Sequence, residues 1–236
     1  MRRVYGSAVA IAAIMLVPRV STAQVTQEAS RSVAGGGISI PGWAGKIDPK
    51  EEAAGQVLAN SKLAKEGTSD MRVVTGPAVA YWNSTNKASG NYTVKATFKE
   101  LQYMSLNDHP HPYGVFIGGN DMGTADQSYL YCAAYGNGNF IVRGFGPAPF
   151  QLNGGRGGAN DAVHKAAGKG QPVTQEIALA VKGDKIDCII NGTVVGSYDK
   201  AAVVGPGKIK STDGIYGIRF AHNTEAIVTG FGMTKN

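Results

Sequence analysis

Hydrophobic and polar residues alternate with a period of two over much of the chain after residue 70. Residues 91–100 show this clearly, because apolar side chains occupy one face and Thr or Lys side chains occupy the other. That pattern predicts an antiparallel strand with one face in solvent. Residues 113–117, 129–135 and 140–145 are apolar on both faces or nearly so, which predicts central strands.

Pairs of turn-forming residues separate the predicted strands. Asn137-Gly138 lies between the second and third of the central strands, and Gly183-Asp184 and Asn191-Gly192 separate three later strands. Such pairs are typical of two-residue turns between antiparallel neighbours. The later predicted strands are residues 176–182, 185–190, 193–198, 215–221 and 226–233.

About ten strands with turn signals at short spacing predict two packed sheets. The helical signal is weak and begins with Asp48-Pro49 followed by two glutamates, but Gly55 interrupts it early. The sequence therefore predicts an all-β fold, a two-sheet antiparallel jelly-roll sandwich with at most one or two short helices.

The periodic pattern disappears in residues 146–172, which are rich in Gly, Pro, Asn and Ala, with a hint of a helical turn at residues 161–165. Loops of this length in compact domains are usually functional or disordered. The segment leaves one hairpin and returns before the next run of strands, so it could cover the open end of a sheet. We therefore treat it as a candidate rim of a binding site.

The first 23 residues carry the three parts of a secretory signal peptide. Arg2 and Arg3 form a charged start, an apolar run follows, and Ser21-Thr22-Ala23 supplies small residues for cleavage. A membrane anchor, the alternative, needs about 20 apolar residues, whereas Pro18 and Arg19 interrupt this run. We expect cleavage after residue 23, a secreted or periplasmic protein, and no transmembrane segment in the mature chain.

The mature chain has two expected parts. Residues 24–39 are small and polar, with three consecutive glycines at their centre, and predict a flexible N-terminal lead. Residues 40–236 make up the predicted sandwich domain. The mature length of 213 residues, 236 minus 23, is within the range of a single all-β domain.

Charge bears on the partners of the protein. The formal net charge is +6, and removal of the signal peptide takes away three arginines and no acid, which leaves +3. The mature chain has no run of Lys and Arg interleaved with aromatic residues. A nucleic-acid partner therefore has little support.

Cys132 and Cys188 are the only cysteines in the sequence. Each lies in a predicted strand beside apolar residues, so both could point into one core and form a disulfide in an exported protein. Such a bond typically stabilises a protein by about 2–5 kcal/mol. Two buried free thiols are the alternative, because the sequence does not give the distance between them.

Several stretches resemble a known superfamily. Gly-Thr-Val-Val at residues 192–195, Gly-Ile-Tyr-Gly-Ile-Arg at residues 214–219, and a last alternating strand ending in Phe231 resemble the C-terminal half of laminin G-like jelly rolls. Those domains belong to the concanavalin A-like lectin and glucanase superfamily. Pro41-Gly42-Trp43 and Gly76-Pro77-Ala78 resemble bacterial secreted 3-keto-disaccharide hydrolase domains of that superfamily.

The resemblance covers residues 40–235 and implies a curved two-sheet sandwich whose concave face or loop rim binds glycans. It also implies a calcium ion in some members and hydrolysis in others. The chain lacks the Glu-x-Asp-x-x-Glu strand motif of laminarinase-type glucanases, so no catalytic residue is carried over. Calcium is implied by the resemblance alone, and the cofactor is otherwise unassigned. The motifs that carry the resemblance have low specificity, because strands bounded by glycine report fold more than chemistry.

The densest polar cluster is Asn-Asp-His-Pro-His-Pro at residues 107–112, just before a predicted central strand. In an extended chain His109 and His111 project to the same side and could present two imidazoles to a metal or a sugar. His222 and Asn223, in the last strand connection, join them if that connection lies close in space. Two imidazoles without a clear third ligand do not define a metal site, so we assign no metal ligands. A proline-stiffened loop whose histidines cap backbone groups is the alternative.

Tyr129, Tyr131 and Tyr135 share one face of a predicted strand, and Arg143 lies on the partner strand of the same hairpin. A ring that stacks on a sugar, beside an arginine that donates hydrogen bonds to hydroxyls, is a plausible carbohydrate-binding arrangement. The alternative is that the tyrosines fill the core between the sheets and that Arg143 lies at its margin.

A jelly roll could bring these strand ends together in a polar pocket with an aromatic wall. The predicted ligand-binding residues are His109, His111, Tyr131, Arg143, His222 and Asn223. We expect a secreted carbohydrate-binding or carbohydrate-processing domain whose partner is a glycan or a cell-surface polymer. The alternatives are a non-enzymatic adhesion or scaffold domain that binds protein or polymer, and a glycan hydrolase.

Catalysis has weaker support than binding. Glycoside hydrolysis ordinarily uses two carboxylates about 5–10 Å apart, and no pair of acids shares a face of a clearly predicted strand. The catalytic residues stay unassigned, and a glycoside hydrolase is the enzyme class we expect if the protein is an enzyme. The sequence has no Gly-x-Ser-x-Gly nucleophile elbow. A phosphate-binding glycine loop needs a strand before it and a helix after it, and the glycine-rich residues 154–158 have neither.

Overall fold

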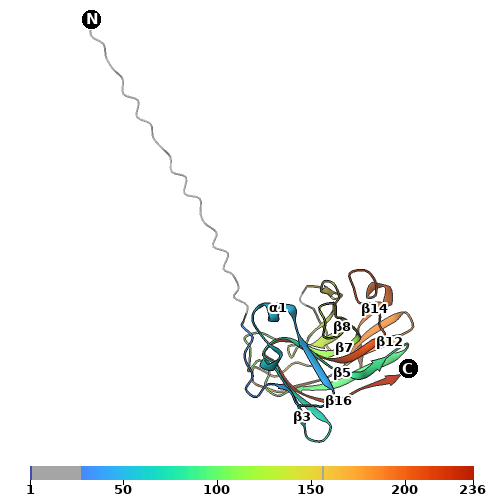
Figure 1. The fold of residues 1–236 in the computed structure, drawn as a ribbon, viewed down its shortest axis with the longest axis horizontal. Coiled ribbons are helices and arrows are strands. Elements are labelled where there is room, and N and C mark those ends of the chain that lie inside the picture. Colours follow the sequence, from blue (N-terminus) through green and yellow to red (C-terminus); the bar gives the residue numbers. More distant parts are fainter. Residues whose placement is uncertain (2–27, 156) are drawn as a thin grey trace.

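The computed structural model describes Met1, residues 28–155 and residues 157–236. Apart from Met1, the predicted signal peptide lies outside the described residues, as do residues 24–27 of the predicted lead. The described residues form two large β-sheets that pack against each other, with short helical turns and loops at their ends (Figure 1).

The order of strands defines the two sheets. The first sheet contains β1 (Gly37–Ile38), β3 (Lys62–Glu66), β4 (Asp70–Val74), β16 (Glu225–Lys235), β6 (Tyr92–Glu100), β12 (Val173–Lys182), β13 (Lys185–Ile190) and β14 (Thr193–Asp199). The second sheet contains β10 (Phe150–Gln151), β9 (Asn139–Phe145), β8 (Ser128–Ala134), β7 (Tyr113–Asn120), β15 (Gly214–Phe220), β5 (Val79–Ala88) and β2 (Trp43–Ile47), and β11 (Gly158–Ala159) pairs with β9. Apart from β1 with β3, the paired strands run antiparallel. The prediction of an all-β, two-sheet antiparallel sandwich is confirmed.

Helical structure is confined to short segments, as predicted. α1 (Pro49–Ala53) is the only α-helix among the described residues, and Leu58–Asn60 and Lys200–Ala202 form single 3₁₀ turns. Proline suits the first turn of α1, and Gly55, with a φ of 81°, follows its end. None of the described helices is long and apolar enough to cross a membrane.

Turn residues set the register of the later strands. Ile190 pairs directly with Thr193, so Asn191-Gly192 forms the two-residue turn that the sequence predicts, and Gly183-Asp184 does the same between β12 and β13. Asn191 and Gly192 have positive φ values of 50° and 80°. Asparagine and glycine adopt this conformation at low cost, which is why they occur in such turns.

The main hydrophobic core lies between the sheets. The four apolar residues of β6 are buried in it, whereas the Thr and Lys residues between them point outward. Cys132 on β8 and Cys188 on β13 are joined by a disulfide with a Cα–Cα distance of 5.8 Å, and both residues are 0% exposed. The bond therefore links the two sheets through the middle of the core.

Residues 28–39 differ from the predicted flexible lead, because they pack against the sandwich. The backbone N–H of Arg31 donates to Oδ1 of Asn223, and Nδ2 of Asn223 donates to the carbonyl oxygen of Ala29. Further along the segment, β1 pairs with β3. Hydrogen bonds to a distant asparagine leave no periodic signal in the sequence, so the sequence alone predicts no packed structure for this segment.

Residues 146–172 contain regular structure that the sequence pattern does not show. β10 and β11 both pair with β9, and Val163 is only 2% exposed within the core. The predicted helical turn at residues 161–165 is a simple turn at its first two positions. Strands of two residues are too short to produce a visible alternation, although they extend the second sheet beyond β9.

Glu100, at the end of β6, is a buried carboxyl group. It is 5% exposed, and its Oε2 atom has no hydrogen-bond partner among the described residues. Burial raises its pKa to about 7. Burial, and after it the nearby charge of Glu100, raises the pKa of the hydroxyl groups of Tyr103 and Tyr113.

We expect Glu100→Gln to stabilise the protein at pH 8 and to change its stability little at pH 4.5. The folded-state pKa of about 7 lies above the ordinary value of 4.5, so this group stabilises the fold fully below pH 4.5, and that contribution is lost as the pH rises through about 7. The gain at pH 8 should be about 1–3 kcal/mol. Urea unfolding at both pH values measures it, and an equal effect at the two values would contradict the prediction.

The double variant Cys132→Ala, Cys188→Ala should lower the free energy of unfolding by about 2–5 kcal/mol. The reason is that the bond spans 56 residues and restricts the unfolded chain. Guanidinium unfolding with and without a reductant tests this. The reductant should lower the midpoint of the wild type towards that of the variant, and a variant as stable as the oxidised wild type would argue against the bond.

Candidate functional site

The face of the second sheet that points away from the core, here called the outer face, carries a row of side chains across its strands. Cross-strand pairs place Gln151, Arg143, Tyr131 and Phe116 next to one another on β10, β9, β8 and β7. Directly paired residues point to the same side of a sheet. The predicted partners Tyr131 and Arg143 therefore lie opposite each other on one face.

Aromatic rings form a second hydrophobic cluster on this outer face. Its members, each at most 5% exposed, are Ala80, Trp82, Phe116, Tyr129, Tyr131, Ala133 and Ile141. The ring centroid of Phe145 is 5.1 Å from that of Tyr129 and 6.1 Å from that of Tyr131, so Phe145 packs against the cluster. The two tyrosines thus belong to the outer face and not to the core between the sheets.

Small residues make room for Arg219 within this aromatic layer. Arg219 is on β15, and its cross-strand neighbours are Gly114 on β7 and Ala80 on β5. Its Cζ atom lies 5.8 Å from the ring centroid of Tyr131 and 5.5 Å from that of Phe145. Both distances are short enough for attraction between the guanidinium and the rings.

An ion pair keeps the buried guanidinium charged. The side chain of Arg219 is 7% exposed, and Nη2 donates a hydrogen bond of 2.6 Å to Oδ2 of Asp48. Burial lowers the pKa of Arg219, but Asp48, Tyr129 and Tyr131 outweigh burial and hold this pKa above its ordinary value. Burial also raises the pKa of both tyrosines, so their hydroxyls stay protonated.

Three polar groups of the outer face are buried and have no hydrogen-bond partner among the described residues. They are Nη1 of Arg219, Oη of Tyr129 and Nε2 of Gln151. Buried polar groups nearly always have a partner, and an unpaired one costs about 1–3 kcal/mol. Arg143, beside Gln151, is half-buried, and its Cζ atom lies 5.5 Å from the ring centroid of Phe145. The face therefore has unused hydrogen-bonding capacity among its rings.

A hollow of about 440 Å³ adjoins the outer face at its β2 edge. It is lined by Gly45, Lys46, Ile47, Glu52, Gln56, Val57, Leu58 and Gly123. A Cβ atom at Gly123 would lie 3.5 Å from the ring of Trp82, which places this loop against the aromatic cluster. Lys46 pairs with Glu52 at 3.4 Å, so charged groups border the apolar layer.

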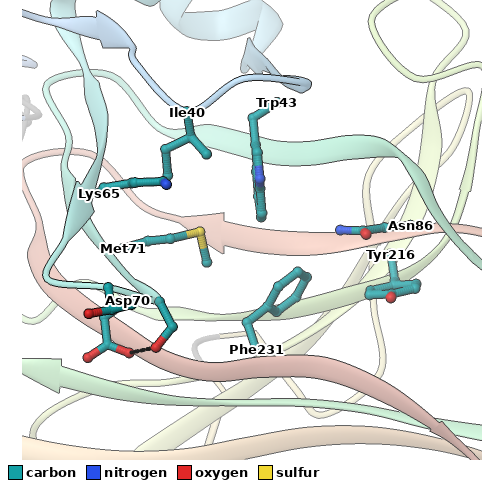
Figure 2. A pocket seen from close by; sticks show the side chains of 10 residues that line it. Ile40, Trp43, Lys65, Asp70, Met71, Asn86, Tyr216 and Phe231 are labelled. Atoms are coloured by element: carbon teal, nitrogen blue, oxygen red, sulfur yellow. Dashed lines mark hydrogen bonds between the residues drawn. The ribbon is translucent and has the colours of Figure 1, made fainter.

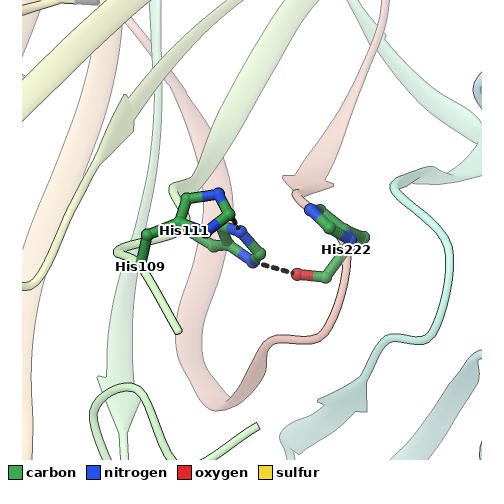
Figure 3. A group of neighbouring side chains, drawn as sticks. All are labelled: His109, His111 and His222. Atoms are coloured by element: carbon green, nitrogen blue, oxygen red, sulfur yellow. Dashed lines mark hydrogen bonds between the residues drawn. The ribbon is translucent and has the colours of Figure 1, made fainter. Parts of the chain in front are cut away.

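The three predicted histidines come together at one end of the second sheet (Figure 3). His109 and His111 precede β7, and His222 follows β15. Because β7 and β15 are antiparallel neighbours, the start of one lies beside the end of the other. The ring centroid of His111 is 4.3 Å from that of His109 and 4.1 Å from that of His222. The structure supplies the third imidazole that the sequence could not place.

Burial determines the charge of the two inner histidines. His111 and His222 are 5% and 8% exposed. Burial is the largest cause that lowers the pKa of each to about 4, and the neighbouring histidines lower it further. Both rings are therefore neutral at neutral pH. His109 is exposed, and its Nδ1 atom lies 2.5 Å from Oδ1 of Asp108.

Asn223 has a positioning role in this cluster. It is fully buried, and both atoms of its side-chain amide bind the backbone of residues 29–31. Its own carbonyl oxygen accepts a hydrogen bond of 2.9 Å from Nδ2 of Asn107. Asn223 thus joins the N-terminal segment to the connection that carries His222.

The six predicted residues fall into two groups. Tyr131 and Arg143 lie on the outer face, whereas the three histidines and Asn223 lie at its β7 and β15 end. Asp48 lies near both groups. It forms an ion pair with Arg219, and its negative charge raises the pKa of both His222 and Tyr131. The single pocket expected from the sequence is therefore an extended surface with two parts.

Comparison with known proteins identifies the architecture. No protein-family model and no curated protein matches the sequence. A Bacillus subtilis protein of unknown function with a galectin-like fold is similar in structure, with a TM-score of 0.56 and 10% identity over 82% of this chain and 89% of that chain. The chain has the concanavalin A-like sandwich fold. The carbohydrate binding module CBM66 from Bacillus subtilis has a TM-score of 0.45 and 8% identity over 85% of this chain and 99% of its own.

A second hollow, of about 240 Å³, was not predicted from the sequence (Figure 2). It is lined by Ile40, Trp43, Lys65, Thr68, Ser69, Asp70, Met71, Asn86, Tyr216 and Phe231. The ring centroid of Phe231 lies 5.6 Å from those of Trp43 and Tyr216. All three aromatic residues are visible in the sequence motifs, but they come from three distant segments, and no local pattern indicates that they meet.

Proposed function

We propose that the protein is an exported glycan-binding domain whose ligand lies on the outer face of the second sheet. The observation that carries the proposal is the set of buried, unpaired polar atoms of Arg219, Tyr129 and Gln151 beside aromatic rings. A sugar has apolar C–H faces and hydroxyl groups, so it matches rings and hydrogen-bonding groups that lie side by side.

Each group has a distinct part in this proposal. The half-buried side chains of Arg143 and Phe145 are the first that a ligand meets. Arg143 offers a planar set of donors that can bind two sugar oxygens at once, and the half-buried ring of Phe145, which packs against the buried ring of Tyr131, offers a stacking surface. Arg219, held by Asp48, directs Nη1 into the same layer.

Binding has more support than hydrolysis, because the carboxylate in contact with Arg219, that of Asp48, is already engaged in an ion pair. A catalytic carboxylate must instead be free to exchange a proton or attack the sugar. The other alternative is an adhesion or scaffold domain, whose ligand is a protein or a polymer without the stacking faces of a sugar. A glycan array and an assay for released reducing sugar distinguish the three functions.

Arg143→Ala should weaken glycan binding about 10-fold to 100-fold, because a hydrogen bond from a charged donor contributes about 1.5–3 kcal/mol. Tyr131→Ala should also weaken binding, because the buried ring of Tyr131 packs against Phe145 and holds that ring in place. Asn223→Ala should cost less affinity than Arg143→Ala, since its amide binds the protein backbone. A glycan array selects the ligand, and isothermal titration calorimetry then measures each affinity.

The second hollow provides matched controls. Tyr216→Ala and Phe231→Ala remove rings from that hollow, and they should leave the affinity unchanged. Loss of binding in these variants, with full affinity in folded Tyr131→Ala and Arg143→Ala, would move the site to the hollow and defeat the proposal. Release of reducing sugar by the wild type would favour the hydrolase, and an array without any glycan bound would favour the scaffold.

We also propose that export removes residues 1–23. The mature chain should begin at Gln24 or within one or two residues of it, because the small residues at positions 21–23 suit cleavage. N-terminal sequencing of material recovered outside the cytoplasm tests this. A secreted chain that still begins at Met1 would contradict it.

A further inference from the structure

The histidine cluster has a chemistry that the proposed glycan face does not use. One ring nitrogen from each of His109, His111 and His222 lies within 4.8 Å of the other two (Figure 3). Within this group, Nε2 of His109 and Nε2 of His111 are 2.9 Å apart. Which of these atoms carries a proton follows from the partners on the other side of each ring.

The Nδ1 atoms of two rings must act as donors. Nδ1 of His111 lies 2.6 Å from the carbonyl oxygen of His222, and a carbonyl oxygen can only accept a hydrogen bond. This contact is shorter than the 3.3 Å between Nδ1 of His111 and Nδ2 of Asn107, so it decides the tautomer. Nδ1 of His109 lies 2.5 Å from the carboxylate of Asp108, which also accepts. In their neutral forms both rings therefore carry the proton on Nδ1.

The third ring has the same arrangement. Nδ1 of His222 lies 3.3 Å from Oγ of Ser30, and that hydroxyl donates its own proton to the carboxylate of Glu51 at 2.6 Å. The oxygen of Ser30 is then an acceptor for Nδ1–H of His222. All three neutral imidazoles thus keep a lone pair on Nε2.

Two lone pairs that face each other at 2.9 Å repel, unless a cation lies between or beside them. We propose that His109, His111 and His222 bind a divalent transition-metal ion of the zinc type, with at least one coordination position open. Zn–N bonds of about 2.0–2.1 Å at tetrahedral angles separate two nitrogens by about 3.3 Å, so the Nε2 atoms of His109 and His111 need only a small shift. The ring of His222, which stacks on that of His111 with an angle of 30° between their planes, must tilt to point its Nε2 atom at the ion. Three protein ligands with an open position are typical of zinc sites that act on a bound molecule.

The donors and their surroundings favour such an ion over calcium. Imidazole suits zinc, copper and nickel, whereas calcium takes six to eight oxygen ligands. Metal-binding histidines almost always donate their other N–H to a carboxylate or a carbonyl, as His109 and His111 do here. The exposed ring of His109 gives an ion access, and the carboxylates of Asp108 and Glu28 lie beside it.

A shared proton is the competing explanation. If His109 is an imidazolium, it donates through Nδ1 to Asp108 and through Nε2 to His111, which satisfies the same short contacts without a metal. The two explanations predict different outcomes, because a metal site takes up Zn²⁺ and releases the shared proton, whereas a proton bridge that serves only the structure takes up none. A metal titration therefore decides between them.

The test uses the mature chain without an affinity tag, stripped of metal by a chelator and titrated with Zn²⁺ by isothermal titration calorimetry at pH 7.5. We expect one ion per chain, a higher melting temperature with Zn²⁺, and visible absorption bands of a tetrahedral site with Co²⁺. His109→Ala should weaken Zn²⁺ binding at least 100-fold, and since its ring is exposed the fold should persist. Asp108→Asn should weaken binding about 10-fold, as outer partners of metal ligands do.

His164→Ala is the matched control. His164 is the one histidine of the sequence outside the cluster; it is exposed, and its Nδ1 atom contacts the backbone carbonyl oxygen of Thr174. This variant should bind Zn²⁺ like the wild type, and Ca²⁺ should not compete. A folded wild type that binds no Zn²⁺ at 1 mM would overturn the proposal in favour of the shared proton. Equal losses in His109→Ala and His164→Ala would overturn it in favour of non-specific binding.

Discussion

The outer face of the second sheet depends on the ion pair between Arg219 and Asp48. A guanidinium with 7% of its side chain exposed loses most of its hydration, and removal of its partner would leave an uncompensated buried charge at a cost of about 3–5 kcal/mol. Asp48 is itself fixed on both sides, because its N–H donates to Ala78 and its carbonyl oxygen accepts from the first turn of α1. The pair therefore ties the segment between β2 and α1 to β15. It also keeps a permanent cation within a layer of aromatic rings.

The pairing of Tyr131 with Arg143 could be predicted from the sequence, whereas the rest of the outer face could not. Alternation fixes which residues of a strand share a face, and Asn137-Gly138 marks the hairpin that brings these two strands together. Arg219 reaches the same face from a strand far along the chain, and Gln151 reaches it from a two-residue strand that follows β9 after residues 146–149. In the sequence, Arg219 ends a strand motif that indicates fold, and Gln151 lies in a segment without periodicity. Their role depends on strand order, which local patterns do not contain.

The histidine cluster, likewise, could be predicted from the sequence only in part. The spacing of His109 and His111 predicts that both rings project to one side, and their ring centroids are indeed 4.3 Å apart. The position of His222 beside them follows from the pairing of β7 with β15, two strands that are far apart in the sequence. A metal site requires a third ligand, so the sequence predicts two neighbouring imidazoles but not the group of three. Only the sheet topology turns two candidate ligands into three.

The N-terminal segment explains why the cluster has a defined proton arrangement. Ser30 accepts from His222 only because its own proton is directed to Glu51, and Glu28 accepts from the backbone N–H of Asp108. Asn223 holds the backbone of Ala29 and Arg31, on either side of Ser30, through two hydrogen bonds. A segment that lacks any hydrophobic pattern thus sets the tautomer of one imidazole and the charge beside another. Polar side chains can therefore determine the chemistry of a site while they contribute nothing to the periodic signal that predicts the fold.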